Sequence, residues 1–405
     1  MKILIDIRRK VNSGIGRVSQ WLANNLNDEL IQNVEFYFLA TNESIKDYKN
    51  LQSESILLSS TRPFSFDDLY DIPKQICQGN FDLYINPQVY SSPFNIVKTV
   101  NFVHDLWPLF DEDWLPSMSD VKNRFNLDDL QAINAMSNWL NDEKAKLFLT
   151  DYGYEEWKSI SNNIGLKYVW SQYTATAILS THICVVSKDT EKYFKKYFNR
   201  KLGISCIPLG LNSKWKNVVR KKPKHFLNLA KLEPRKNVSK LIDAYELYCK
   251  STKNPYPLII AGDPGYREYA NNILEKINKM NEQQLKISFL DSISDEKIAE
   301  LFSESAALIF PSKFEGFGLP PLEAMSSGVP VIASITGMMA TELGNNATLL
   351  KTDNPKEIAS CMMDLTINPT HYEEKAIIAR KEITKKIYEF TIKEKWINLI
   401  KDLII

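Results

Sequence analysis

Short apolar runs alternate with amphipathic stretches along most of the chain. Five runs with strand character lie in the first half, at residues 2–7, 34–40, 82–87, 97–103 and 182–187. Five more lie in the second half, at residues 225–230, 257–263, 286–291, 306–312 and 330–334. Each run of the second series is followed by a helical pattern or a turn. Strands that alternate with helices are typical of α/β proteins with parallel sheets.

A basic link at residues 218–226 has little apolar periodicity and predicts a domain boundary. We therefore expect an N-terminal Rossmann-like domain at residues 1–218 and a C-terminal one at residues 219–389. Between these runs, the stretch from His104 to Thr181 is rich in aromatic residues and has few strand signals, so helices are expected there.

The composition restricts the number of domains and the classes of protein, but it does not identify a function. A chain of 405 residues fits two domains of about 200 residues each. The 50 basic and 49 acidic side chains give a net charge of +1, which weighs against a nucleic-acid-binding protein. The N-terminus has only three consecutive apolar residues, so no signal peptide is expected, and no run approaches the length that spans a bilayer.

The cysteines and histidines show no metal-ligand spacing. The five cysteines are scattered and odd in number, which fits the reduced thiols of a cytoplasmic protein. We therefore expect no zinc or iron site. The acidic triplet Asp111-Glu112-Asp113 superficially offers a D-x-D pair for a divalent metal, but it lacks the preceding strand and is predicted to be a loop.

The most informative segment is residues 310–333, which run FPSKFEGFGLPPLEAMSSGVPVIA. The order is a buried strand, a glycine loop and a short helix that has Pro320 and Pro321 in its first turn and ends at Gly328. In a parallel sheet such a loop lies at the carboxyl end of a strand, where ligands bind. Free backbone N–H groups there can receive oxyanions. Glu315 and Glu323 flank this turn, and the combination suits a nucleotide sugar.

This segment closely resembles the signature of retaining glycosyltransferases of family 4. The resemblance implies the GT-B fold, in which two Rossmann-like α/β domains face each other across a cleft. It also implies that Glu315 lies beside the transferred sugar and that Glu323 holds the nucleotide ribose. Donor-binding positions between them are Gly316, Phe317, Gly318 and Leu319. The alternative for the glutamate pair alone is an ordinary βα unit in which Glu323 simply favours the helix dipole.

Residues 228–237, NLAKLEPRKN, resemble the segment in which this family clamps the donor diphosphate with two basic residues. By position these are Lys231 and Lys236. The family usually has arginine at the first position, and lysine loses the bidentate fork of arginine. Arg235 is expected to point to solvent. The alternative is a solvated loop, but a basic helix start opposes the helix dipole and so favours a bound anion.

Two N-terminal segments also match the family. Residues 11–17, VNSGIGR, follow a strand, where Gly14 and Gly16 would let the backbone approach the donor and Arg17 would add charge; the alternative is a turn with a good helix start at Arg17. His104, with Asp105, follows the strand at 97–103 and resembles the family's HD segment. The resemblance implies a histidine beside the transferred sugar, and the alternative is a structural histidine.

Other positions leave two interpretations open. Ser187 could bind the donor or cap the helix that starts near Lys188, and Gly210 also matches a position on the cleft side. Residues 191–203 mix lysines with aromatic residues, which suits an anionic membrane surface or a solvated helix with one buried aromatic face.

The resemblance implies a retaining hexosyltransferase with His104, Glu315 and Lys236 as catalytic residues and a nucleotide-diphosphate sugar as co-substrate. No metal cofactor is expected. The acceptor would be a hydroxyl of a growing glycan, free or lipid-linked, in surface polysaccharide synthesis such as that of lipopolysaccharide. The GIGR loop with the HD segment resembles bacterial mannosyltransferases, which favours GDP-mannose and leaves UDP- and dTDP-sugars open.

Other classes remain open as well. One is a nucleotide-sugar epimerase or a sugar phosphorylase on a similar fold, and another is a non-catalytic sugar-nucleotide-binding protein. The expected location is the cytoplasm, with peripheral contact at the inner face of the membrane as an open alternative. As in other GT-B proteins, the final helix, at 390–405, is expected to pack on the N-terminal domain.

Overall fold

A computed structural model describes most of the chain. The described residues are 1–9, 14–26, 31–48, 51–61, 63, 67–89, 92, 94–109, 130–160, 163–200, 203–265, 267–335, 341, 343–351, 353–386 and 389–404. Five features of the sequence analysis fall partly or wholly outside them. These are the acidic triplet at 111–113, residues 11–13 of the glycine segment, residues 110–129 and 161–162 of the aromatic-rich stretch, residues 201–202 of the basic aromatic segment, and residue 405 of the final helix.

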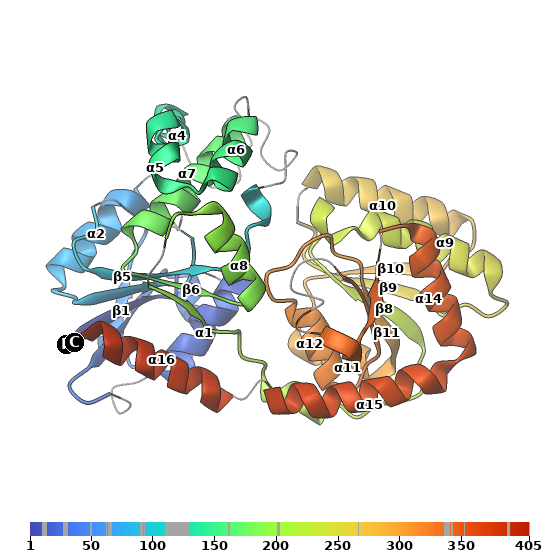
Figure 1. Ribbon diagram of the computed structural model, residues 1–405. Coiled ribbons are helices and arrows are strands. Elements are labelled where there is room, and N and C mark those ends of the chain that lie inside the picture. Colours follow the sequence, from blue (N-terminus) through green and yellow to red (C-terminus); the bar gives the residue numbers. More distant parts are fainter. Residues whose placement is uncertain are drawn as a thin grey trace. The chain divides into compact units, whose positions relative to one another are not determined.

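The chain forms two compact units (Figure 1). The first comprises Met1–Gly210 with Phe390–Ile405, and the second comprises Leu211–Glu389. The change of unit thus comes before the basic link at 218–226. The reason is Trp215, whose ring lies 5.6 Å edge-on from that of Phe302 in the second unit.

The first unit is built on a seven-stranded parallel sheet of order β3-β2-β1-β4-β5-β6-β7. Its strands are β1 (Lys2–Asp6), β2 (Glu35–Ala40), β3 (Ile56–Leu58), β4 (Leu83–Asn86), β5 (Lys98–Val103), β6 (His182–Val185) and β7 (Ile204–Cys206). Its helices are α1 (Gly14–Asn25), α2 (Asp68–Gln78), α4 (Leu130–Ser137), α5 (Asp142–Phe148), α6 (Asp151–Ser159), α7 (Ile164–Leu179), α8 (Lys188–Tyr197) and α16 (Glu389–Ile404). Short 3-10 turns are η1 (Ser44–Asp47), η2 (Ser53–Ser55) and η3 (Trp107–Leu109).

The final helix packs on this first sheet. Trp396 of α16 is fully buried and stacks on Phe102 of β5, with ring centroids 5.5 Å apart. At the end of the helix, Lys98 donates from its Nζ to the carbonyl of Leu403 at 2.5 Å. Burial of one large aromatic side chain contributes about 2–3 kcal/mol, so α16 is firmly held there.

The second unit has a six-stranded parallel sheet of order β10-β9-β8-β11-β12-β13. Its strands are β8 (His225–Leu229), β9 (Leu258–Gly262), β10 (Ile287–Asp291), β11 (Ser305–Phe310), β12 (Val331–Ser334) and β13 (Thr348–Leu350). Its helices are α9 (Val238–Ser251), α10 (Arg267–Glu282), α11 (Asp295–Glu304), α12 (Leu319–Ser326), α14 (Pro355–Ile367) and α15 (Pro369–Lys386). Its 3-10 turns are η4 (Ser213–Asn217), η5 (Pro234–Lys236) and η6 (Gly344–Asn346).

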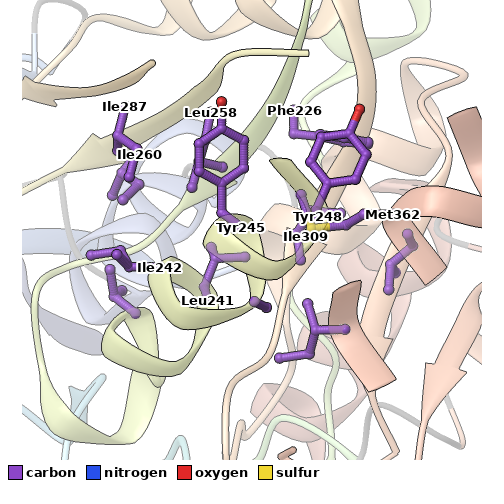
Figure 2. Close-up of a cluster of buried hydrophobic side chains, with 14 of the residues drawn as sticks. Phe226, Leu241, Ile242, Tyr245, Tyr248, Leu258, Ile260, Ile287, Ile309 and Met362 are labelled. Carbon is purple, nitrogen blue, oxygen red and sulfur yellow. The ribbon is translucent and has the colours of Figure 1, made fainter. Parts of the chain in front are cut away.

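The core of the second unit lies where α9 covers the sheet (Figure 2). Buried residues of α9 recur at helical spacing, at Val238, Leu241, Ile242, Tyr245 and Tyr248. Their partners on the sheet include Phe226, Leu258, Ile260, Ile287 and Ile309. This packing fixes the start of α9, and therefore the basic turn that precedes it.

All ten apolar runs contain a strand, which confirms the α/β prediction with two parallel sheets. Three strands were missed, namely β3, β7 and β13. Each lies at the edge of its sheet and has three residues. A strand of that length shows too few apolar positions for the alternation to stand out.

The short helix α12 ends as the sequence predicts. Gly328 has φ +73°, its N–H bonds to the carbonyl of Met325 at 2.9 Å, and the N–H of Val329 bonds to the carbonyl of Ala324 at 2.9 Å. This pair of bonds is the Schellman arrangement, which favours glycine because its φ is positive.

We predict that Gly328→Ala lowers the free energy of unfolding of the second unit by about 1 kcal/mol. The space beside Gly328 is adequate, since the nearest atoms to an added Cβ are the Arg380 side chain at 3.4 Å, so the cost comes from the backbone angle. Thermal unfolding measures it, with Gly328→Asn as the control that tolerates a positive φ better. Equal midpoints for wild type and Gly328→Ala would contradict the assignment.

Candidate functional site

The basic segment at 228–237 and the glycine segment at 310–333 meet at the carboxyl ends of β8 and β11. These strands are neighbours in the second sheet, although β9 and β10 come between them in the chain. The chain passes outward from β8 through β9 to β10, and then returns to begin the other half at β11. That reversal of strand order is where open parallel sheets bind their ligands. Residues 230–237 follow β8, and residues 311–318 follow β11.

Lys236 and Glu315 form a buried ion pair at this point. The Lys236 ammonium contacts Oε1 of Glu315, and the two residues are 8% and 7% exposed. The ammonium also lies 5.1 Å from the centre of the Phe310 ring. Burial lowers the pKa of Lys236, and the nearby Arg235 adds to this effect. Burial alone would raise the pKa of Glu315, but Lys236 and Arg235 hold it below its usual value, so the carboxylate is ionised.

Arg235 does not point to solvent, and that prediction was wrong. Its Nε donates to Oε2 of Glu233 at 3.1 Å, and its Nη1 lies 3.2 Å from Oε2 of Glu315. The same Nη1 donates to the carbonyl of Phe314 at 3.2 Å. The sequence did not indicate this position of Arg235, because its two carboxylate partners follow different strands. The nearby Glu233 was the signal that could have indicated it.

Lys231 completes the cluster. Its ammonium lies 3.2 Å from Oε1 of Glu233, and its side chain is about one third exposed. The cluster therefore consists of three cations, Lys231, Arg235 and Lys236, and two carboxylates, Glu233 and Glu315. Three positive and two negative charges leave a net charge of +1, which suits an anionic ligand.

The glycine turn leads directly from this cluster into α12. Gly318 precedes the helix in the left-handed conformation, with φ +74° and ψ +51°. Phe317 and Leu319 are buried, so their side chains hold the turn against the core. Glu323 lies within α12 and is only 3% exposed. The structure thus places every donor-binding position predicted for the second unit within one strand-turn-helix segment or in the basic turn beside it.

The first unit has its own polar network at the carboxyl end of β1. Arg8 donates from Nε and Nη2 to both carboxylate oxygens of Asp6 and from Nη1 to Asp68 at 2.7 Å, and Tyr84 donates to Asp6 at 2.8 Å. Burial would lower the pKa of Arg8, but Asp6 and Asp68 raise it far above its usual value. The sequence analysis did not single out these residues. The network ties the chain after β1 to the carbonyl of Thr61, at 3.1 Å, and to the start of α2.

Helix α1 begins earlier than predicted. It starts at Gly14 instead of Arg17, so Gly14, Gly16 and Arg17 all lie in its first turn. Gly14 is exposed and has nothing within 4 Å of an added Cβ, whereas Gly16 is buried. A role of these residues in donor binding stays a prediction.

His104 follows β5 and is half-buried. Its Nε2 donates to the carbonyl of Pro87 at 2.8 Å, since a carbonyl can only accept. Burial lowers the pKa of His104 to about 4. The imidazole is therefore neutral at neutral pH, with Nδ1 as an acceptor that suits a sugar hydroxyl.

Ser187 caps helix α8. Its Oγ accepts from the N–H of Thr190 at 3.1 Å and lies 2.9 Å from the Thr190 hydroxyl. The capping interpretation of Ser187 is therefore the one that the geometry supports, and ligand binding stays a prediction.

The basic aromatic segment buries its rings. Phe194, Tyr197 and Phe198 belong to the core of the first unit, whereas the lysines of α8 at 188, 192, 195 and 196 are exposed. The described part of this segment thus corresponds to a solvated helix with a buried aromatic face. In the part of the chain that the structure covers, no helix has both the length and the apolarity to cross a bilayer.

We predict that His104 titrates with a pKa near 4, below the range of an ordinary histidine. NMR of the four histidines with labelled imidazoles measures this, and a His104→Gln variant assigns the signal. A His104 signal that titrates near pH 6.5, or that shows the Nδ1–H tautomer, would contradict this account.

Comparison with known proteins agrees with this geometry. Residues 211–383 match the family described as glycosyl transferases group 1. The O-antigen chain mannosyltransferase B of Escherichia coli is 39% identical over 110 residues, which are 27% of this chain and 28% of that protein. The O-antigen chain mannosyltransferase RfbU of Salmonella typhimurium is 30% identical over 187 residues, which are 45% of this chain and 50% of that protein. The match thus spans half or less of these relatives.

Solved structures share the whole fold. Anabaena HepE in complex with UDP and glucose has a TM-score of 0.66 at 15% identity, over 99% of this chain and 100% of that chain. WaaG, a glycosyltransferase involved in lipopolysaccharide biosynthesis, has a TM-score of 0.63 at 13% identity, over 99% of both chains. These neighbours confirm the predicted GT-B fold class, and at such identities they show the fold alone.

Proposed function

We propose that the chain is a retaining hexosyltransferase that uses a nucleotide-diphosphate sugar, because residues 211–383 match the family described as glycosyl transferases group 1. One observation supports this most. The cluster of Lys231, Arg235 and Lys236 with two carboxylates has a net positive charge and lies where the strand order of the second sheet reverses.

The chemistry of sugar transfer fits this cluster. As the bond to the anomeric carbon breaks, negative charge grows on the departing diphosphate. Fixed cations at that position stabilise the transition state more than the ground state. Lys236 and Lys231 would take this role, and the ionised Glu315 would accept hydrogen bonds from the sugar hydroxyls. Glu323, buried in α12, would receive the ribose hydroxyls.

For the donor we propose GDP-mannose, and for the acceptor a hydroxyl of a glycan in surface polysaccharide synthesis. Support comes from the relatives named as O-antigen mannosyltransferases. UDP-glucose is the second candidate, because the fold neighbour HepE was solved with UDP and glucose. In this proposal the second unit binds the donor and the first unit binds the acceptor.

The direct test is a thermal-shift series of the full chain with GDP-mannose, UDP-glucose and dTDP-glucose. A ligand at a hundred times its dissociation constant stabilises the native state by about 2.7 kcal/mol. NMR of the transferred sugar with a mannoside acceptor then determines whether the anomeric configuration is retained. No stabilisation by any of the three donors would contradict the proposal, and an inverted product would contradict its retaining mechanism.

We predict that Lys236→Ala and Lys231→Ala each weaken donor binding by about 1.5–3 kcal/mol, the usual worth of a hydrogen bond to a charged group. The fold should survive in Lys236→Ala because Arg235 still pairs with Glu315. Calorimetry with the donor and initial rates at low and saturating donor measure the effect. The matched control is Lys240→Ala, which removes an exposed charge from the first turn of α9. Wild-type affinity in both cluster variants would exclude the clamp.

We predict that Glu315→Ala and Glu323→Ala lose different parts of donor affinity. Glu315→Ala should weaken the binding of the intact nucleotide sugar much more than the binding of the nucleoside diphosphate, because Glu315 is assigned to the sugar. Glu323→Ala should weaken the binding of both ligands by the same amount, because Glu323 is assigned to the ribose. Calorimetry with GDP and with GDP-mannose separates the two patterns. The same pattern in both variants would show that the roles are not divided in this way.

A further inference from the structure

Glu315 is held by two cations at once. Its Oε1 contacts the ammonium of Lys236, and its Oε2 lies 3.2 Å from Nη1 of Arg235. One positive charge is enough to neutralise the carboxylate, so the presence of a second cation calls for an explanation. The two cations also differ in their anchoring. Arg235 also donates to Glu233 and to the carbonyl of Phe314, whereas the Lys236 ammonium donates to Glu315 itself.

The reason follows from donor binding, and this step rests on the proposed function. An ammonium is a point charge with three donors, and it is drawn to an arriving diphosphate. As Lys236 turns to the phosphate oxygens, its contact with Glu315 weakens. Glu315 would then be a buried carboxylate with a new dianion nearby. Both burial and a neighbouring negative charge disfavour an ionised carboxylate.

We propose that Arg235 is a positioning residue that keeps Glu315 ionised and in place while Lys236 exchanges Glu315 for the donor diphosphate. Arginine suits this role because its guanidinium is always charged and its planar fork can bond two carboxylates. Its bonds to Glu233 and Phe314 hold it back, so it stays with Glu315 when the phosphate arrives.

The groups that face Glu315 determine its protonation. Lys236 and Arg235 come from the turn η5, and the Ser312 hydroxyl comes from the segment before the glycine turn. Glu233 lies behind Arg235 and is paired with Lys231. If Arg235 loses its charge, Glu315 keeps Lys236 in the free protein and loses most of its counter-charge in the donor complex. The pKa of Glu315 then rises on binding, so the carboxylate takes up a proton.

Calorimetry of the full chain tests this at several pH values, in buffers with different ionisation enthalpies. The probes are GDP-mannose and UDP-glucose, whose diphosphate does not titrate near neutral pH. Wild type should bind with little proton exchange from this site. Arg235→Gln should bind at least about tenfold more weakly at neutral pH, take up as much as about one proton per donor, and recover affinity as the pH falls.

Three variants control for a merely structural effect. Arg235→Lys keeps the charge and should abolish the proton uptake, with part of the affinity restored. The double variant Arg235→Gln with Glu315→Gln should also lose the proton uptake, because glutamine does not titrate. Lys240→Gln removes an exposed charge from α9 and should behave like wild type. If Arg235→Gln does not fold, Arg235→Met takes its place.

The outcomes separate the two proposals. Wild type that binds neither donor contradicts the proposed function. Wild type that binds, beside a folded Arg235→Gln or Arg235→Met that binds equally well and takes up no proton, contradicts only the role of Arg235. Weaker binding with no change in proton uptake would also overturn it, because it would mean that Arg235 contacts the donor or shapes the turn without controlling Glu315.

Discussion

A charge that is buried at the end of a parallel sheet has to be paired, and this requirement joins two distant segments of the second unit. Lys236 and Glu315 are 79 residues apart in the chain and form one buried ion pair. Removing Glu315 would leave the buried Lys236 charge uncompensated at a cost of about 3–5 kcal/mol, whereas Glu315 would keep Arg235 if Lys236 were removed. The pair therefore fixes the turn after β8 and the turn after β11 relative to each other, and the glycine turn and α12 are positioned with them.

The pair on its own would be an inert structural contact. Arg235, Glu233 and Lys231 extend it into a network that has one positive charge more than it has negative charges. This network exists in the free protein, and Arg235 is held in it by Glu233 and the Phe314 carbonyl as well as by Glu315. The packing of α9 on the sheet supports this arrangement. The buried face of α9 holds the helix on the sheet, and the basic turn is the segment that leads into that helix.

Sequence patterns predict the strands of four to six residues, including the edge strand β10, and miss the three-residue edge strands β3, β7 and β13. Central strands such as β8 and β11 are covered on both faces, so all their residues are buried and the apolar run is clear. Lys236 and Glu315 were predicted because a motif fixes their distance from a strand end. The direction of Arg235 was not predictable in the same way. It depends on two carboxylates, Glu233 and Glu315, that only the folded sheet brings together.

Each of the two sheets reverses its strand order once, and the charge clusters at the two reversals have net charges of opposite sign. In the first sheet, where the reversal lies between β1 and β4, Arg8 is surrounded by Asp6 and Asp68, so the buried trio has a net charge of −1. The Tyr84 hydroxyl, which donates to Asp6, offsets part of it. This trio is closed by its own contacts and offers little to an anion. The cluster at the second reversal has a net charge of +1, so its electrostatic potential favours an anion at this end of the second sheet.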